Sequence, residues 1–206
     1  MPKIVDGELR RLELADAAAR LIARGGLGAV TMRDVATEAG LTTGSVTHYF
    51  SDKRELLLFT LNTSLERRRG RRNAVANVGP AVALQASLDG ALPLDADRLR
   101  HWMVTIAFCT LAAGDAELAA AQRDAYREFR NTVTAQLVQC GLPAAAAQRE
   151  AERLIAVVDG VAMQALFDTD SWPAARQSAV LADALAGLPV GNDASRRRNG
   201  NRKGSV

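Results

Sequence analysis

Apolar side chains recur every three or four residues along most of the chain, and glycine, proline or capping residues interrupt this pattern. Such spacing is typical of amphipathic helices, because residues three and four apart share one helix face. The pattern predicts helices at about 8–24, 32–39, 43–50, from 51 or 52 to about 72, and then at 80–90, 97–113, 115–140, 144–167 and 173–186. We therefore expect an all-α fold of about nine helices.

Local signals support the boundaries of the first helices. The pair Gly25-Gly26 can end the first helix, since glycine readily adopts a left-handed conformation. Thr31 is a suitable N-cap for the second helix, with Asp34 at the third position in a variant of the capping box. Gly40 can end that helix, and Thr42 can cap the next. The segment 31–50 is therefore expected to form two short helices joined by a tight turn.

Composition agrees with a globular protein that lacks a metal or redox centre. The chain is 48% hydrophobic and 24% charged, and it contains no apolar run of about 18 residues. Charges near the N-terminus argue against a signal peptide, so we expect a cytoplasmic protein with no membrane partner. Cys109 and Cys140 lack metal-ligand spacing, and we interpret them as reduced packing residues, with a redox role as the alternative. We expect no cofactor.

Charge is distributed unevenly along the chain. Residues 1–72 carry a net charge of +4, residues 73–190 carry −5, and residues 191–206 carry +4, which together give the net +3. A basic segment suits a polyanionic partner such as DNA, whereas an acidic one does not. The N-terminal third and the tail are therefore the parts expected to approach nucleic acid.

Four positions in the segment 31–50 have the spacing of a helix-turn-helix. Ala36 is small enough to lie where two helices cross, and Gly40 tolerates the backbone conformation of the turn. Leu41 and Val46 can fill the angle between the helices from the second one. In this motif the second helix lies in the DNA major groove.

The second helix of this motif carries short polar side chains at Thr43, Ser45 and Thr47. A helix that enters a groove about 12 Å wide needs short side chains where it approaches the base edges. Hydroxyl groups can also bind phosphates or bases. The alternative is a small polar surface helix with no ligand.

The stretches TMRDVATEAGL and TTGSVTHYFSDKRELL resemble the DNA-binding domain of the tetracycline-repressor (TetR) family of transcriptional regulators, over about residues 9–57. The choline-responsive branch is the most similar, since it also has a small residue and His-Tyr-Phe here. The resemblance implies a homodimeric, sequence-specific regulator of a double-stranded DNA operator, usually a repressor released by a small molecule. It also implies a DNA-binding domain at 1–55 and a ligand-binding and dimerisation domain at 56–190. The composition of the tail, rich in Gly, Ser, Asn and Arg, predicts a disordered basic segment at 191–206.

The same resemblance implies roles for individual residues near DNA. Tyr49 would contact the DNA backbone, with core packing as the alternative, and His48 would face the groove or be an ordinary surface residue. Phe50 is expected in the core. The complete expected DNA-binding set is Thr31, Arg33, Thr42, Thr43, Gly44, Ser45, Thr47, His48, Tyr49 and Lys53. Many relatives carry a basic residue at position 43 and tyrosine at 47, so the operator sequence cannot be transferred.

The acidic middle of the chain is expected to hold the effector pocket. Segment 98–109 combines apolar side chains with a few polar ones, as ligand pockets do. A second aromatic group recurs at helical spacing further along and can form the opposite wall. The expected pocket residues are His101, Trp102, Thr105, Phe108, Tyr126 and Phe129. The alternative is that these residues fill the core.

The last two helices resemble those through which family members form dimers. Gly160 and several alanines permit close approach of a second chain. Asp159 lies within this apolar run, and we interpret it as a hydrogen-bonded structural residue, with a ligand contact as the alternative. The expected dimer residues are Leu154, Val157, Val158, Val161, Ala165, Leu181 and Leu185.

Two other classes of function are less consistent with the sequence. An enzyme would need a nucleophile with a base or a metal cluster, but the chain has only two histidines and no phosphate loop or HExxH motif. A nonspecific architectural DNA-binding protein would explain the arginine-rich tail, but it would leave the large acidic region without a task. The sequence therefore favours a specific regulator.

Overall fold

A computed structural model of the protein describes residues 3–73, 79–112 and 114–188. Over these ranges the chain forms nine α-helices and one short 3-10 helix, with no strand, which confirms the predicted all-α fold. The helices are α1 (Lys3–Gly25), η1 (Leu27–Ala29), α2 (Met32–Glu38), α3 (Thr43–Tyr49), α4 (Lys53–Asn73), α5 (Pro80–Asp89), α6 (Ala96–Ala112), α7 (Ala116–Gln139), α8 (Ala144–Phe167) and α9 (Ala174–Ala186). The predicted disordered tail, 191–206, lies outside the described residues.

The chain divides into two compact units, and the division falls within α4 and α7. The first unit comprises residues 1–70 and 93–126, and the second comprises residues 71–92 and 127–206. The first unit therefore contains α6 and most of α4 in addition to the helix-turn-helix. The expected functional boundary near residue 55 does not coincide with this division and stays a prediction.

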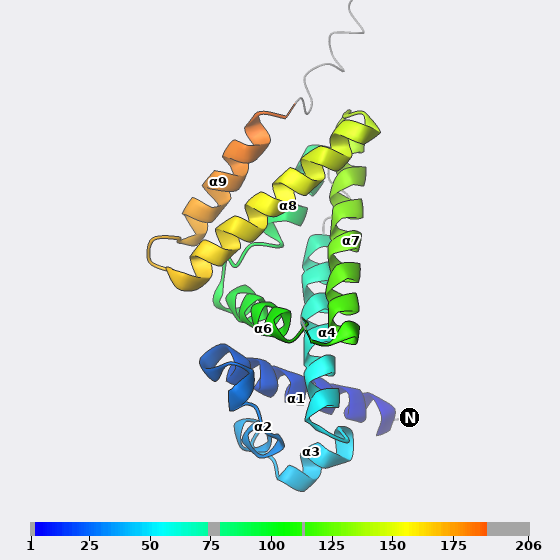
Figure 1. Ribbon diagram of the computed structural model, residues 1–206, viewed down its shortest axis with the longest axis vertical. Helices are drawn as coiled ribbons and strands as arrows, with labels where there is room; N and C mark the ends of the chain where they lie inside the picture. The colour runs from blue at the N-terminus through cyan, green and yellow to red at the C-terminus, as the bar shows by residue number, and fades with distance from the viewer. Residues whose placement is uncertain (1–2, 74–78, 113, 189–206) are drawn as a thin grey trace, which may run out of the picture. The chain divides into compact units, whose positions relative to one another are not determined.

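In the first unit α1 lies between the α2–α3 pair on one side and α6 on the other (Figure 1). Its alanines let neighbouring helices approach closely, and Ala17 and Ala18 are completely buried. Around them lie large side chains that are also fully buried. Burial of one such side chain contributes about 1.5–3 kcal/mol. The largest are Leu14, Ile22, Phe50, Leu56, Leu61 and Phe108.

Ion pairs tie α1 to the elements around it. Arg20 lies 2.6 Å from Glu38 at the end of α2, and Arg24 pairs with the same carboxylate. Hydrogen bonds from Arg24, and then from Arg20, lower the pKa of Glu38 below its ordinary value. Arg67 of α4 pairs with Asp16 of α1. The basic side chains of α1 and α4 therefore serve largely to hold this unit together.

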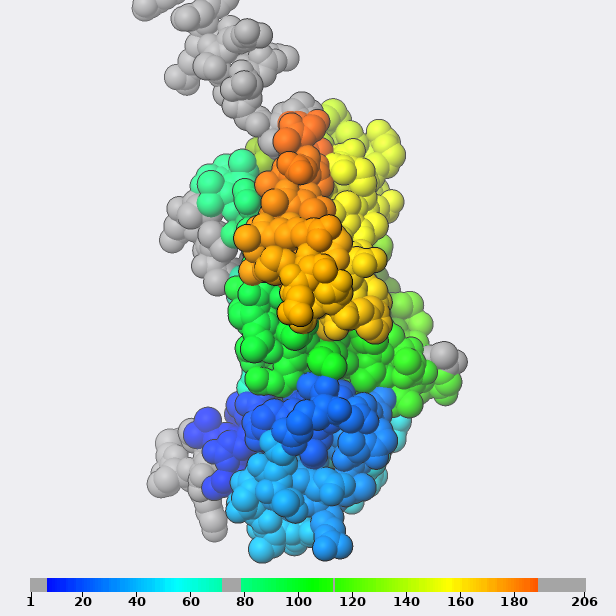
Figure 2. Space-filling model, turned by 90° about the vertical axis from the view of Figure 1, so that its left-hand side faces the viewer, coloured from blue at the N-terminus to red at the C-terminus, as the bar shows by residue number. Residues whose placement is uncertain are grey.

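The second unit contains α5, α8, α9 and the C-terminal part of α7. α8 and α9 lie side by side and are joined by a short connection (Figures 1 and 2). Arg153 of α8 donates a hydrogen bond to the Ala184 carbonyl of α9 at 2.8 Å. Gly141 ends α7 with φ +101°. The buried side chains include Leu84, Leu88, Val133, Leu137, Ala151, Leu154, Val158 and Leu181.

Within the described parts of the chain, no helix is both long enough and apolar enough to cross a membrane.

Candidate nucleic-acid interface

The turn between α2 and α3 has the geometry that the sequence predicts. Gly40 adopts φ +68°, a left-handed conformation that side chains with a Cβ rarely adopt. The amide of Leu41 donates to the Ala36 carbonyl at 2.8 Å, so the chain reverses immediately after α2. Ala36 is 2% exposed and Val46 is fully buried where the two helices pack. This packing fixes the orientation of α3 relative to α2.

A threonine caps the N-terminus of each helix in this pair. The Thr31 hydroxyl accepts a hydrogen bond from the Asp34 amide at 3.1 Å. The Thr42 hydroxyl accepts one from the Ser45 amide at 3.2 Å. Each bond satisfies a backbone N–H group that has no acceptor within the helix. Replacement of such a cap by alanine lowers stability by about 1 kcal/mol. Both threonines are therefore structural as well as exposed.

The face of α3 away from the core is continuous and polar. Val46 is its only buried side chain, and the Thr47 hydroxyl donates to the Gly44 carbonyl at 3.1 Å. Ser45 and Tyr49 are half-buried, and the Tyr49 and His48 rings lie edge to face with centroids 4.9 Å apart. The exposed residues are Thr42, Thr43, Gly44, Thr47 and His48. Every predicted groove residue on α3 is thus at least partly exposed.

The C-terminal end of α3 is held by an arginine whose role the sequence did not reveal. Arg11 of α1 donates to the Tyr49 carbonyl at 2.7 Å and to Glu55 at 3.0 Å. Its guanidinium lies 4.4 Å from the centre of the Phe50 ring and 4.6 Å from that of Phe59. Phe50 is 1% exposed, as its predicted core role requires. Arg11 therefore satisfies the Tyr49 carbonyl at the end of α3 and holds Tyr49 in position.

Glu55 completes this anchor from the start of α4. Its carboxylate accepts hydrogen bonds from the Ser51 amide at 2.8 Å and from the Ser51 hydroxyl at 3.0 Å. These two bonds, followed by that from Arg11, lower the pKa of Glu55. A serine followed four residues later by glutamate was the available sequence signal. The partner of Glu55 on α1, Arg11, could not be identified from the sequence alone.

Two cations near the helix-turn-helix, Arg33 and Lys53, make no ion pair with a carboxylate in the described part of the chain. Arg33 is exposed on α2. Lys53, half-buried at the start of α4, donates from Nζ to the Leu27 carbonyl at 3.2 Å. Arg10, by contrast, pairs with Glu13 at 2.6 Å. Both unpaired cations belong to the expected DNA-binding set.

The expected effector-pocket residues on α6 are buried and make internal contacts. His101 Nδ1 lies 2.8 Å from the Ser64 hydroxyl, and its Nε2 lies 3.2 Å from Asp97. The Arg68 guanidinium lies 4.6 Å from the centre of the Trp102 ring. Thr105 is 1% exposed. This serine, histidine and aspartate do not form an accessible catalytic triad, since Ser64 is only 2% exposed.

The other expected pocket residues are distributed over both units. Phe108 lies in the core of the first unit and is fully buried. Tyr126 is half-buried at the last position of that unit, and Phe129 is buried in the second. The six-residue pocket therefore stays a prediction.

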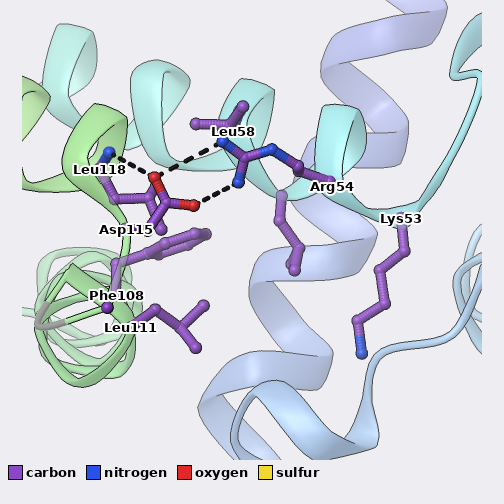
Figure 3. Close-up of a pocket in the computed structure, with 9 residues that line it drawn as sticks. Lys53, Arg54, Leu58, Phe108, Leu111, Asp115 and Leu118 are labelled. Carbon is purple, nitrogen blue, oxygen red and sulfur yellow. Dashed lines mark hydrogen bonds and ion pairs between the residues drawn. The ribbon is translucent and has the colours of Figure 1, made fainter.

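A cavity of about 550 Å³ lies within the first unit, beside the start of α4 (Figure 3). Phe108 is the only expected pocket residue that lines it. Arg54, at one side, pairs with Asp115 and lies 2.8 Å from Glu117. The lining residues are Lys53, Arg54, Leu57, Leu58, Phe108, Leu111, Gly114, Asp115 and Leu118.

The expected dimer residues lie mainly inside the second unit. Leu154, Val158, Val161, Ala165 and Leu181 are at most 5% exposed in a single chain. Val157 and Leu185 are half-buried and remain accessible. Asp159 is half-buried too. A second chain would thus meet only part of the expected set.

Comparison with known proteins identifies two parts of the chain. Residues 14–58 match the family described as bacterial regulatory proteins, tetR family. Residues 80–189 match the family described as BetI-type transcriptional repressor, C-terminal. The HTH-type transcriptional regulator PksA of Bacillus subtilis is 33% identical over 172 residues, which are 82% of this chain and 84% of the relative.

Two further proteins are similar over most of their length. The HTH-type transcriptional regulator BetI of Paraburkholderia phytofirmans is 31% identical over 94% of this chain and 95% of the relative. The crystal structure of a putative transcriptional regulator from Saccharomonospora viridis in complex with choline has a TM-score of 0.81, covers 90% of this chain and 100% of that one, and is 22% identical, so it shows the fold alone. The predicted family is confirmed, and these relatives are regulators rather than enzymes. This chain belongs to the TetR family of DNA-binding transcriptional regulators and carries a BetI-type C-terminal region.

Proposed function

We propose that this protein is a repressor that binds a palindromic operator as a homodimer and leaves it when a small molecule binds. The observation that carries the proposal is the exposed, polar face of α3 next to two cations, Arg33 and Lys53, that have no carboxylate partner among the described residues. Short hydroxyl side chains suit close approach to base edges, and the cations suit the phosphates that flank a groove. The cytoplasm, where bacterial DNA lies, is the expected place of action.

In this proposal the DNA contacts divide into two kinds. Residues on α3 and its cap read the groove, namely Thr42, Thr43, Gly44, Ser45, Thr47 and His48. The remaining residues of the expected set, Thr31, Arg33, Tyr49 and Lys53, hold the backbone. Lys53 keeps two N–H donors for a phosphate while its third binds the Leu27 carbonyl.

The dimer surface that we propose lies on the exposed sides of α8 and α9. Phe167 is 81% exposed and Met163 37% exposed, which is unusual for side chains of this size. Exposed residues on α8 recur with the spacing of one helix face at 156, 160, 163 and 167, and exposed alanines on α9 recur with the same spacing at 175, 179, 182 and 186. From the expected set we keep the accessible Val157 and Leu185.

The effector is a small molecule whose identity stays open in this proposal. The Saccharomonospora protein was crystallised with choline, a quaternary ammonium that aromatic side chains bind well. Here one face of Trp102 is already covered by the Arg68 guanidinium, and Phe108 is enclosed in the core. These contacts give no reason to transfer choline to this chain.

Selection of binding sites from random DNA, followed by a screen for small molecules that release the selected site, tests the proposal. A dimer should enrich a palindrome whose half-sites lie one or more helical turns apart. Binding of all DNA with equal affinity would instead support the architectural alternative. Replacement of Tyr49 by alanine should weaken binding of the selected site without lowering the melting temperature.

A further inference from the structure

The cavity beside the start of α4 has the size and lining of a small-molecule site. Its volume of about 550 Å³ lies within the range of about 300–1,000 Å³ that is usual for such sites. Five apolar side chains form most of its wall, and they are contributed by α4, α6 and α7. Leu57 and Leu118 are at most 8% exposed, whereas Leu111 at the rim is 40% exposed. A ligand can therefore enter past Leu111 and bury an apolar body.

The charges around the cavity indicate which kind of polar group it accepts. Among the lining residues Arg54 is balanced by Asp115; Glu117, which also pairs with Arg54, is 66% exposed and is not one of the lining residues. Lys53 has no carboxylate partner among the described residues, and its ammonium bonds only to a neutral carbonyl. In Figure 3 Lys53 extends on the side of the cavity opposite Phe108 and Leu111. The unbalanced charge at the cavity is thus positive and lies across from its apolar wall.

We infer that this cavity binds a small amphipathic anion, whose carboxylate or similar group pairs with Lys53 while its hydrocarbon part packs on the accessible Leu58 and Leu111. A cation is disfavoured there, because it would face Lys53 and find one aromatic ring instead of a cage. A neutral molecule of equal length would gain the apolar contacts alone. The inference rests on the proposed function only in its consequence for DNA.

That consequence follows from the position of Lys53 in the chain. Lys53 lies four positions after Tyr49, the last residue of α3, and its ammonium ties the start of α4 to η1, which precedes α2. An anion that takes this ammonium removes a proposed phosphate contact and competes with the Leu27 carbonyl. Binding at the cavity therefore weakens the DNA complex without contact between the anion and α3.

Calorimetry with the full chain and three ten-carbon probes tests the site in the absence of DNA. Decanoate should bind saturably. Decanol, which has no charge to pair with Lys53, should bind roughly tenfold more weakly, a difference of about 1.4 kcal/mol. Decyltrimethylammonium, which carries the same sign of charge as Lys53, should bind more weakly still. Leu111→Trp should fill the cavity at its rim, and Lys53→Met should keep the stem while removing the charge. Each substitution should weaken decanoate binding at least about tenfold.

A matched control and a DNA measurement separate the possible failures. Val138→Trp places the same ring at an exposed position of α7 in the second unit and should leave decanoate binding unchanged. Leu111→Trp should retain binding of the selected operator but lose its release by decanoate. No saturable decanoate binding by the wild type, equal binding of the cationic probe, or unchanged binding by both cavity variants would overturn the inference. Failure to select an operator would overturn the proposed function and leave the calorimetric result standing.

Discussion

α3 and α8 both expose a row of side chains that includes a glycine, but the chemistry of the two rows is opposite. α3 presents the hydroxyls of Thr43 and Thr47 beside Gly44, with no exposed aliphatic side chain. α8 presents Gly160 among apolar residues and ends at Phe167, which is 81% exposed. Small size lets a helix approach its partner closely in both cases. In our proposal the remaining chemistry suits hydrated DNA for the first helix and an apolar protein surface for the second.

Gly160→Arg gives the largest expected effect, because it places a long charged side chain in the middle of the proposed dimer surface. A Cβ at Gly160 would meet no atom within 4 Å in the single chain, so the fold should tolerate the change. Loss of the second half-site should weaken operator binding by roughly 10²–10⁴-fold. Sedimentation should report a monomer, and fluorescence anisotropy should report the lost affinity.

Gly160→Ala is the control for this substitution. It should keep the dimer and raise the melting temperature slightly, because alanine is favoured over glycine inside a helix by about 1 kcal/mol. A Gly160→Arg protein that remains dimeric with full affinity would place the dimer surface elsewhere.

The two helices also show what the sequence could and could not predict. α3 has a single buried side chain, Val46, so its outward face could be predicted from the turn and the hydroxyls alone. α8 is apolar on both sides, and periodicity does not tell a core-facing residue from one that faces a partner. The sequence therefore selected Leu154 and Val158, which are fully buried in one chain. The expected set did not include the exposed Met163 and Phe167, and the dimer surface stays a prediction.

The same limit applies to α6. Its mixture of polar and apolar residues indicated a pocket, but the polar groups of His101 and Thr105 are directed to Ser64 and Arg68 of α4. Such partners lie 37 positions away in the chain, and no local pattern reveals them. The helix boundaries, by contrast, depend on local capping residues, and most were predicted to within one or two positions.

Arg33→Ala is expected to have an intermediate effect, and this effect should be restricted to DNA binding. Arg33 is exposed and makes no ion pair among the described residues, so its removal should leave stability unchanged. Loss of one phosphate contact in each half of a dimer should reduce the slope of log affinity against log salt by about 1.8. Anisotropy titrations at several salt concentrations measure this slope.

Arg10→Ala is the matched control, since it removes the same charge from a side chain paired with Glu13. It should change the salt slope less than Arg33→Ala does. Equal changes for both variants would mean that net charge, and not a specific phosphate contact, explains the effect.

Glu55→Gln tests the support of α3 without altering its exposed face, and its expected effect is the smallest. The hydrogen bonds from Ser51 and Arg11 lower the pKa of Glu55 in the folded protein below its ordinary value of 4.5. A carboxyl group of this kind stabilises the fold above the unfolded pKa, and the contribution is lost as pH falls through the folded pKa. The glutamine side chain of the variant has no charge to lose.

The difference in melting temperature between wild type and the Glu55→Gln variant should therefore be present at neutral pH and vanish in acid. A difference that persists unchanged in acid would mean that Glu55 acts through packing, and that its charge does not hold Arg11 against the end of α3.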